Sequence, residues 1–200
     1  ECSLQKLYME WDALPARGDV PKNRKPKRVD LGPRIVLDDE RCILCGRCVR
    51  FCAEVAKQPQ LVIAQRGARS LLTTAPGQHL DHPYSLNTVD ICPVGALTDK
   101  DFRFKVRVWN LSATASVCNG CAAGCKVEVH HHRGRVHRLV PRRFRDLNLN
   151  WLCDAGRATY KSITAERLTS PRLRGQEASW EAALAAVAGG LGAGRAAPET

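Results

Sequence analysis

The stretch Cys118-Asn119-Gly120-Cys121-Ala122-Ala123-Gly124-Cys125 places three cysteines at the spacing CxxCxxxC, and Trp151-Leu152-Cys153-Asp154-Ala155-Gly156-Arg157 supplies a fourth. Three thiolates on one tight loop and one remote thiolate are the ligands that a cubane iron–sulfur cluster requires. Small residues separate the first three cysteines, which leaves room for such a cluster. The spacing therefore predicts a [4Fe–4S] cluster held by Cys118, Cys121, Cys125 and Cys153.

An upstream group of cysteines has a different spacing. Residues 42–52 contain the run CxxCxxCxxxC, and one more cysteine, Cys92, stands directly before Pro93. A cysteine followed by proline is typical of ferredoxin clusters, whereas Cys52 precedes an alanine and no second CxxCxxC run lies nearby. We therefore predict that Cys52 is a buried thiol and that a second [4Fe–4S] cluster is held by Cys42, Cys45, Cys48 and Cys92.

Zinc is the alternative occupant of both groups. Structural zinc sites usually present paired CxxC motifs, so a triplet with a single remote cysteine suits a cubane better. The consecutive histidines 130–132 alternate between the faces of a strand and cannot form one metal site, so they are expected to be an exposed polar segment. The sequence contains no nucleotide-binding glycine loop and no nucleophile paired with a base, so no catalytic residue is predicted.

Composition supports metal binding over disulfides. The chain has ten cysteines in 200 residues, and they are clustered. The first residues lack a secretory signal, and no apolar stretch approaches the roughly 18 residues of a membrane span. Clustered cysteines in a chain without such a signal favour metal. The absence of an initiator methionine predicts an internal fragment of a longer protein.

The chain is strongly basic. Its formal charge of +11 counts the cysteines as neutral, and two clusters at about −2 each would leave about +7. Much of the excess lies in residues 22–34 and 133–145. Aromatic residues do not interleave with the first basic run, as nucleic-acid stacking would require. The charge therefore favours docking to acidic partner subunits over nucleic-acid binding.

Local patterns predict a mixture of short helices and strands. Helices are expected at 2–14, 49–57, 84–91 and around 180–191, and an extended proline-rich segment at 15–33. Strands are expected at 34–37 and 102–109, with hairpins at 61–64/70–74 and 126–130/136–140. The fold class is α+β. The expected domains are the tail of another cluster domain with a linker (1–33), a ferredoxin-like domain (34–105), a β-rich cluster module (111–167) and the start of a further domain (168–200).

The chain resembles the large iron–sulfur subunit of respiratory complex I, the NADH-quinone oxidoreductase. The resemblance is carried by Arg41–Cys52, by Asn87–Thr98 and by Phe102–Phe104. The opening Glu1-Cys2-Ser3-Leu4-Gln5 resembles the end of that family's motif of one His and three Cys, which implies that Cys2 is a ligand of a third cluster, incomplete in this fragment. The module at 111–167 is similar to the Mo/W bis-MGD-type [4Fe–4S] module that opens the molybdopterin-oxidoreductase-like region.

The resemblance implies a single-electron relay from the flavin, fed by NADH, toward quinone. It implies contact with the flavin subunit and peripheral-arm subunits, and with the membrane only through the complex, at the cytoplasmic face of the inner membrane. The second cluster would lie beside the main path. Arg157, where molybdopterin enzymes usually have lysine, implies no molybdopterin and is expected near the second cluster's charge. The alternatives are an NAD-linked formate dehydrogenase or hydrogenase diaphorase, and a zinc-stabilised nucleic-acid-binding module.

Overall fold

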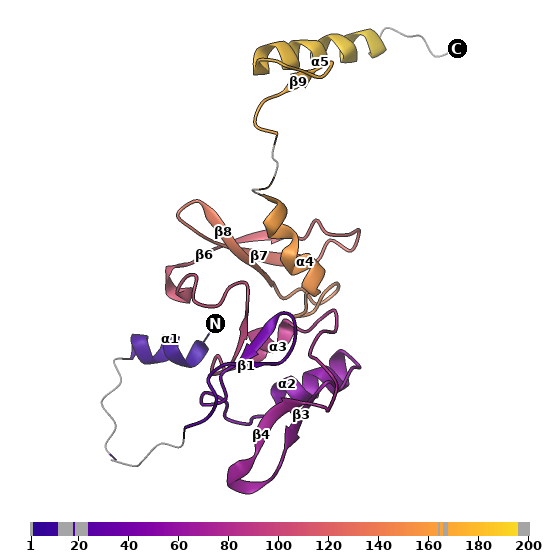
Figure 1. Ribbon diagram of the computed structural model, residues 1–200. Coiled ribbons are helices and arrows are strands. Elements are labelled where there is room, and N and C mark those ends of the chain that lie inside the picture. Colours follow the sequence, from indigo (N-terminus) through magenta and orange to yellow (C-terminus); the bar gives the residue numbers. More distant parts are fainter. Residues whose placement is uncertain (1, 12–17, 19–23, 164, 166–167, 196–200) are drawn as a thin grey trace. The chain divides into compact units, whose positions relative to one another are not determined.

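The computed structural model describes residues 2–11, 18, 24–163, 165 and 168–195 (Figure 1). The chain divides into two compact units, Glu1–Tyr160 and Lys161–Thr200, and each is treated separately below. The first unit contains both groups of cysteines. It begins with helix α1 (Ser3–Glu10), which Cys2 caps. Among the described residues, no helix is long and apolar enough to cross a membrane.

A three-stranded antiparallel sheet forms the centre of the first cysteine domain. Its order is β1 (Val29–Asp30), β2 (Ile35–Leu37), β5 (Leu97–Asp99). All three residues of β2 are buried, because this strand is central and covered on both faces. The buried side chains of the surrounding core are Leu31, Ile35, Leu37, Phe51, Cys52, Leu61, Leu72, Leu80, Leu86, Val89, Ala96 and Leu97.

Short helices and one hairpin complete this domain. Helix α2 (Arg47–Arg50) continues into a π-helical turn, Phe51–Val55. The antiparallel hairpin of β3 (Leu61–Ala64) and β4 (Leu71–Thr74) follows, with a 3₁₀ turn at Gly67–Arg69 between its strands. Helix α3 (Asn87–Ile91) then leads directly to Cys92, and a further 3₁₀ turn is Val108–Asn110.

The second cysteine domain is a small antiparallel sheet with one helix against it (Figure 1). The strands are β6 (Ser112–Val117), β7 (Lys126–His132) and β8 (Arg135–Pro141), in that order. Helix α4 (Asp154–Ala158) packs against β8, and a 3₁₀ helix, Thr159–Ile163, follows it. The buried hydrophobic cluster is limited to Cys118, Val127, Leu139 and Leu152. Because this core is small, much of the stability of the domain must come from the group that closes the cysteine loops.

Residues 168–195 of the second unit form a hairpin, with two residues in each strand, and one long helix. Strands β9 (Arg172–Leu173) and β10 (Gln176–Glu177) pair antiparallel. Helix α5 (Trp180–Arg195) begins after Ser179, whose hydroxyl accepts a hydrogen bond from the backbone N–H of Ala182. This is the side-chain cap that serines commonly provide at helix starts.

Most predicted elements are present, with shifted ends. Both hairpins and the strand at 34–37 are confirmed, and the helix predicted around 180–191 is α5. The helix predicted at 84–91 starts only at Asn87, after a series of turns. The helix predicted at 2–14 covers Ser3–Glu10, and its last three predicted residues lie outside the described residues. Much of the predicted extended segment and the start of the first basic run also lie outside them.

The strand predicted at 102–109 is wrong. These residues form turns and the 3₁₀ turn at Val108–Asn110. The backbone of Phe104 has a φ of 61°, which lies in the left-handed region and cannot continue a strand. The alternation of aromatic and basic residues that suggested a strand instead places Arg103 over the Phe104 ring and Arg107 over the Trp109 ring.

Candidate metal centres

The four predicted thiols of the first centre line one pocket. Cys42, Cys45, Cys48 and Cys92 line the same pocket. Apolar residues close its walls, among them Leu72, Ala96 and Leu97. Cys52 is not among the lining residues. The fold thus brings the remote Cys92 to the loop of three thiols.

Two backbone turns shape this pocket. In the first loop, Leu44 has a φ of 53° and Gly46 a φ of 73°. Gly46 stands at the start of α2, where its freedom in the left-handed region lets the loop turn into the helix. On the other side, Cys92 ends α3 in an extended conformation, and Pro93 follows. A proline there cannot continue the helix, so the chain turns away and leaves the Cys92 thiol at the pocket.

Burial keeps the Cys42 and Cys48 thiols protonated when no cation is bound, because it raises the pKa of each. It raises the pKa of Cys48 to about 12, and the neighbouring thiols of Cys92 and Cys42 add to this effect. The pKa of Cys42 is also raised, first by burial, and to a lesser extent by Asp39 and by the Cys92 and Cys45 thiols. A thiol must lose its proton to ligate a metal, so a cation that binds here releases protons.

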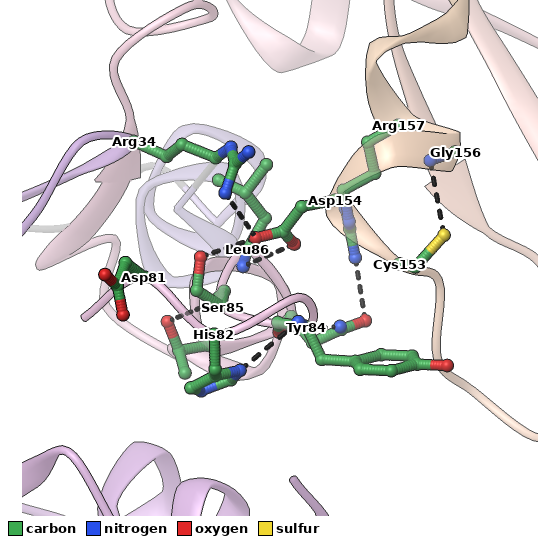
Figure 2. A network of polar contacts seen from close by, with 12 residues as sticks. Arg34, Asp81, His82, Tyr84, Ser85, Leu86, Cys153, Asp154, Gly156 and Arg157 are labelled. Carbon is green, nitrogen blue, oxygen red and sulfur yellow. Dashed lines mark hydrogen bonds and ion pairs between the residues drawn. The ribbon is translucent and has the colours of Figure 1, made fainter. Parts of the chain in front are cut away.

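Cys52 has a separate environment. It is 0% exposed, and its Sγ lies 3.4 Å from Nε2 of His82. Nδ1 of His82 accepts a hydrogen bond from the backbone N–H of Tyr84 (Figure 2), so Nε2 carries the proton and donates to the sulfur. Burial raises the pKa of Cys52 to about 11 and lowers the pKa of His82. The pair is a neutral contact inside the core.

The predicted thiols of the second centre also converge. Burial raises the pKa of Cys125, and the Cys118, Cys121 and Cys153 thiols are near enough to raise it further. The backbone N–H of Cys118 donates to the carbonyl of Cys125 at 2.8 Å, which closes the loop. Cys153 caps α4 with its sulfur, which accepts from the N–H of Gly156 at 3.2 Å (Figure 2).

Gly156 makes the approach of two sulfurs possible. A Cβ at this position would lie 3.1 Å from Sγ of Cys118 and 3.2 Å from Sγ of Cys153. Both distances are tighter than ordinary contacts, so any side chain here would push the thiols apart. No sequence pattern assigned this glycine a role, although its place three residues after a cysteine is visible in the motif.

Within the described residues, no three His, Cys, Asp or Glu side chains converge on one point as ligands of a lone ion would. A cubane cluster instead occupies a volume between its four thiolates. The four thiols of the first centre line one common pocket, as such a cluster requires.

Cys2 lies next to the first centre. Its Sγ accepts from the N–H of Gln5, and the N–H of Leu4 donates to the carbonyl of Pro93 at 3.3 Å. Cys2 also lines a cavity with Arg41 and the segment Phe102–Trp109. The loop that carries Cys2 therefore contacts the segment directly after Cys92.

The consecutive histidines lie in β7 with separate partners, but they are partly buried and not exposed as predicted. His130 accepts from Nε of Arg138 at 3.1 Å, and His131 contacts the Thr114 hydroxyl. Nδ1 of His132 lies 2.8 Å from the carbonyl of Asn110. Pairing with β6 and β8 on both sides covers this strand, which explains the partial burial.

Arg157 contacts the first cysteine domain. Its guanidinium donates to Oδ1 of Asn87 at 2.8 Å and forms an ion pair with Asp90. It was expected near the second cluster's charge, but its described partners lie on α3 and at the Leu152 carbonyl. Next to Cys153, Asp154 is 2% exposed and accepts from the Ser85 hydroxyl and the Leu86 N–H (Figure 2). Sequence patterns gave no sign of these contacts between the domains.

We expect Gly156→Ala to remove the second centre selectively. Alanine favours helix over glycine, so any loss must come from crowding of the two sulfurs and of Cδ1 of Leu152, 3.2 Å from the added Cβ. Iron should fall from about eight to about four per chain, the content of one cubane. The control is Gly189→Ala in α5, where an added Cβ meets nothing within 4 Å. Metal analysis of both variants tests this, and full iron in Gly156→Ala would contradict the crowding argument.

Comparison with known families agrees with this geometry. Residues 32–98 match the family described as NADH-quinone oxidoreductase subunit 3, ferredoxin-like domain. Residues 111–165 match the molybdopterin oxidoreductase Fe4S4 domain. The resemblance to the iron–sulfur subunit of NADH-quinone oxidoreductase is thereby confirmed. The predicted ferredoxin-like and Fe4S4 domains are thereby confirmed, while the limits predicted for each domain and the role of residues 168–200 stay predictions.

Individual proteins are moderately similar to this chain. An NADH-quinone oxidoreductase subunit of Streptomyces coelicolor is 38% identical over 98% of this chain and 24% of its own length. The NADPH-Fe(3+) oxidoreductase subunit alpha of Geobacter sulfurreducens is 35% identical over 96% of this chain and 22% of its own length. The structure of an NAD+-reducing [NiFe]-hydrogenase matches at 33% identity and a TM-score of 0.43, covering 54% of this chain and 47% of that chain. The chain spans about a quarter of the curated relatives it matches.

Proposed function

We propose that the chain is an electron-relay segment of an NADH-quinone oxidoreductase and holds two [4Fe–4S] clusters. Cys42, Cys45, Cys48 and Cys92 hold the first, and Cys118, Cys121, Cys125 and Cys153 hold the second. The observation that carries the proposal is the convergence of Cys92 on the pocket of the other three thiols. This pocket lies in the segment that matches the subunit 3 ferredoxin-like family.

The residues present fit a cubane in both places. The first pocket has four thiols and apolar walls. In the second, a glycine stands where a Cβ would crowd two of the sulfurs. Cysteine thiolates are the usual ligands of [4Fe–4S] clusters. The donor set and the apolar lining of the first pocket therefore support the proposal.

The protein's part in the relay is to hold and tune the centres. A bound [4Fe–4S] cluster takes up and gives up one electron at a potential that its surroundings set. Backbone amides contribute in the second centre, where Gly156 donates to the Cys153 sulfur and Gly120 to the Cys118 sulfur at 3.4 Å. Such hydrogen bonds favour the more negative state of a sulfur ligand. Leu72, Ala96 and Leu97 restrict water at the first centre.

The partners and the third centre are part of the same proposal. The chain would take electrons from a flavin subunit fed by NADH and pass them toward quinone, at the cytoplasmic face of the membrane and through other subunits of the complex. Cys2 would complete a third cluster whose other ligands lie outside this sequence. No molybdopterin is proposed, because the Arg157 guanidinium is occupied by Asn87 and Asp90 and so is not free to face a pterin.

A soluble NAD(P)-linked oxidoreductase is the second candidate. The similarity to the NADPH-Fe(3+) oxidoreductase subunit supports it. The match of residues 32–98 to the quinone oxidoreductase family favours the first candidate. Purification distinguishes the two, because the complete protein would remain with membrane subunits in one case and without them in the other.

Metal analysis tests the cofactor part of the proposal. We expect the anaerobically prepared protein to contain about eight iron and eight acid-labile sulfide per chain, as two cubanes with four cysteines each. Absorption near 400 nm should accompany them. One zinc per cysteine set, with no sulfide, would contradict the proposal.

A further inference from the structure

The two candidate centres are joined through two short helices. Helix α3 ends at Cys92 of the first centre, and helix α4 begins after Cys153 of the second. The side chains of α4, and the backbone of the residue before Cys153, contact α3 and the turn before it (Figure 2). A displacement of one cysteine can therefore reach the other through a few contacts.

The side-chain amide of Asn87 forms hydrogen bonds with the backbone next to Cys153 through both its nitrogen and its oxygen. Its Nδ2 donates to the carbonyl of Leu152 at 2.9 Å, and its Oδ1 accepts from the N–H of Leu152 at 3.1 Å. Asn87 and Leu152 are both buried. This reproduces the pairing of two strand residues and fixes the residue directly before the Cys153 ligand.

Arg157 adds charge to the same junction. It is 7% exposed, and its guanidinium contacts Asn87, Asp90 and the Leu152 carbonyl. Asp90 stands two residues before Cys92, and Arg157 four residues after Cys153. A buried arginine needs its partners, because an unpaired charge in this position is costly. The ion pair thus holds the two cysteine loops in one relative position.

We propose that Arg157 is a positioning residue through which the second centre stabilises the first. When the second centre is lost, the Cys153 loop becomes more mobile, and the ion pair of Arg157 with Asp90 and its hydrogen bond to Asn87 weaken. The first centre then releases iron more readily. This inference rests on the proposed function, since it takes both cysteine sets to hold clusters.

The experiment is a double-mutant cycle in the complete protein. Cys121→Ala removes the second centre, and Arg157→Lys keeps the charge but loses the planar fork that bridges Asn87 and Leu152. The measurement is the rate at which a chelator abolishes the EPR signal of the first centre, identified as the signal that Cys121→Ala retains. Arg50→Lys is the matched control, because Arg50 lies on α2 near the first centre and pairs only with exposed Glu54 among its described ion pairs.

We expect each single variant to accelerate iron release from the first centre by about tenfold, and the double variant to do no more than either. This result follows if both substitutions weaken the same contacts of Arg157, because those contacts can be lost only once. The Arg50→Lys control should leave the rate unchanged. Wild-type protein without iron and sulfide would refute the proposed function itself. If the wild-type protein holds both clusters, two results would refute only the coupling. One is a rate of iron release about a hundredfold higher in the double variant, which means that the two single effects multiply. The other is an unchanged rate in Arg157→Lys.

Discussion

Replacing Cys92 by serine abolishes the first cluster, whereas replacing Cys52 by serine leaves it in place. This is the expected result because Cys92 lines the pocket with the three loop thiols, while Cys52 faces His82 inside the core. In the reduced protein, EPR should show the first centre's signal in Cys52→Ser and not in Cys92→Ser. Iron should fall from about eight to about four only in Cys92→Ser.

Each variant serves as the control for the other, since both replace one sulfur by one oxygen in the same domain. Cys52→Ser places a hydroxyl in a fully buried site, which lowers stability on its own; thermal unfolding of the variant separates that effect from ligand loss. An unchanged first signal in Cys92→Ser with a lost signal in a folded Cys52→Ser would reverse the ligand assignment.

Replacing Cys121 by alanine should impair assembly of the full complex more than its turnover. The second cysteine domain buries only Cys118, Val127, Leu139 and Leu152 in its described hydrophobic cluster, so its stability depends on closure by the cluster of iron and sulfur. A core of this size supplies little stability alone. We expect poor assembly, but near-normal NADH-to-quinone turnover per assembled flavin, because the resemblance places this centre beside the main path. The looser first centre proposed above affects iron retention and still allows electron transfer while its cluster is bound.

The measurement for this variant is turnover normalised to assembled flavin, with Gly189→Ala as a control that touches neither centre. Full assembly with turnover lowered a hundredfold would show that the second centre carries the electrons. In that case the division between a transporting and a structural centre would have to be abandoned.

The sequence was most informative where chemistry constrains spacing. The cysteine spacings predicted two sets of four thiols, and the structure gathers both sets, although their role as ligands stays a prediction. Alternating apolar residues predicted the hairpins at 61–74 and 126–140, since each has two strands around a short turn. These signals are local, so a single chain is enough to detect them.

Signals that depend on distant neighbours were missed. Strand β5 has only three residues and exists because β2 pairs with it. Strand β6 is a run of small and polar residues that no hydrophobic pattern marks. Phe102–Trp109 alternates like a strand, yet it lacks a pairing partner among the described strands and turns at Phe104. The role of Arg157 was also hidden, because Asn87 and Asp90 lie far away in the sequence.

Because Cys52 contacts His82, completion of the first centre depends on tertiary folding. The run at 42–52 offers four thiols in one segment, enough to satisfy a cluster before the rest of the domain has formed. The Cys52 sulfur contacts His82 and lies outside the pocket. On the proposed assignment, the fourth ligand comes from Cys92, which follows α3 directly. A chain that retains its first cluster has therefore already brought two distant segments into their native places.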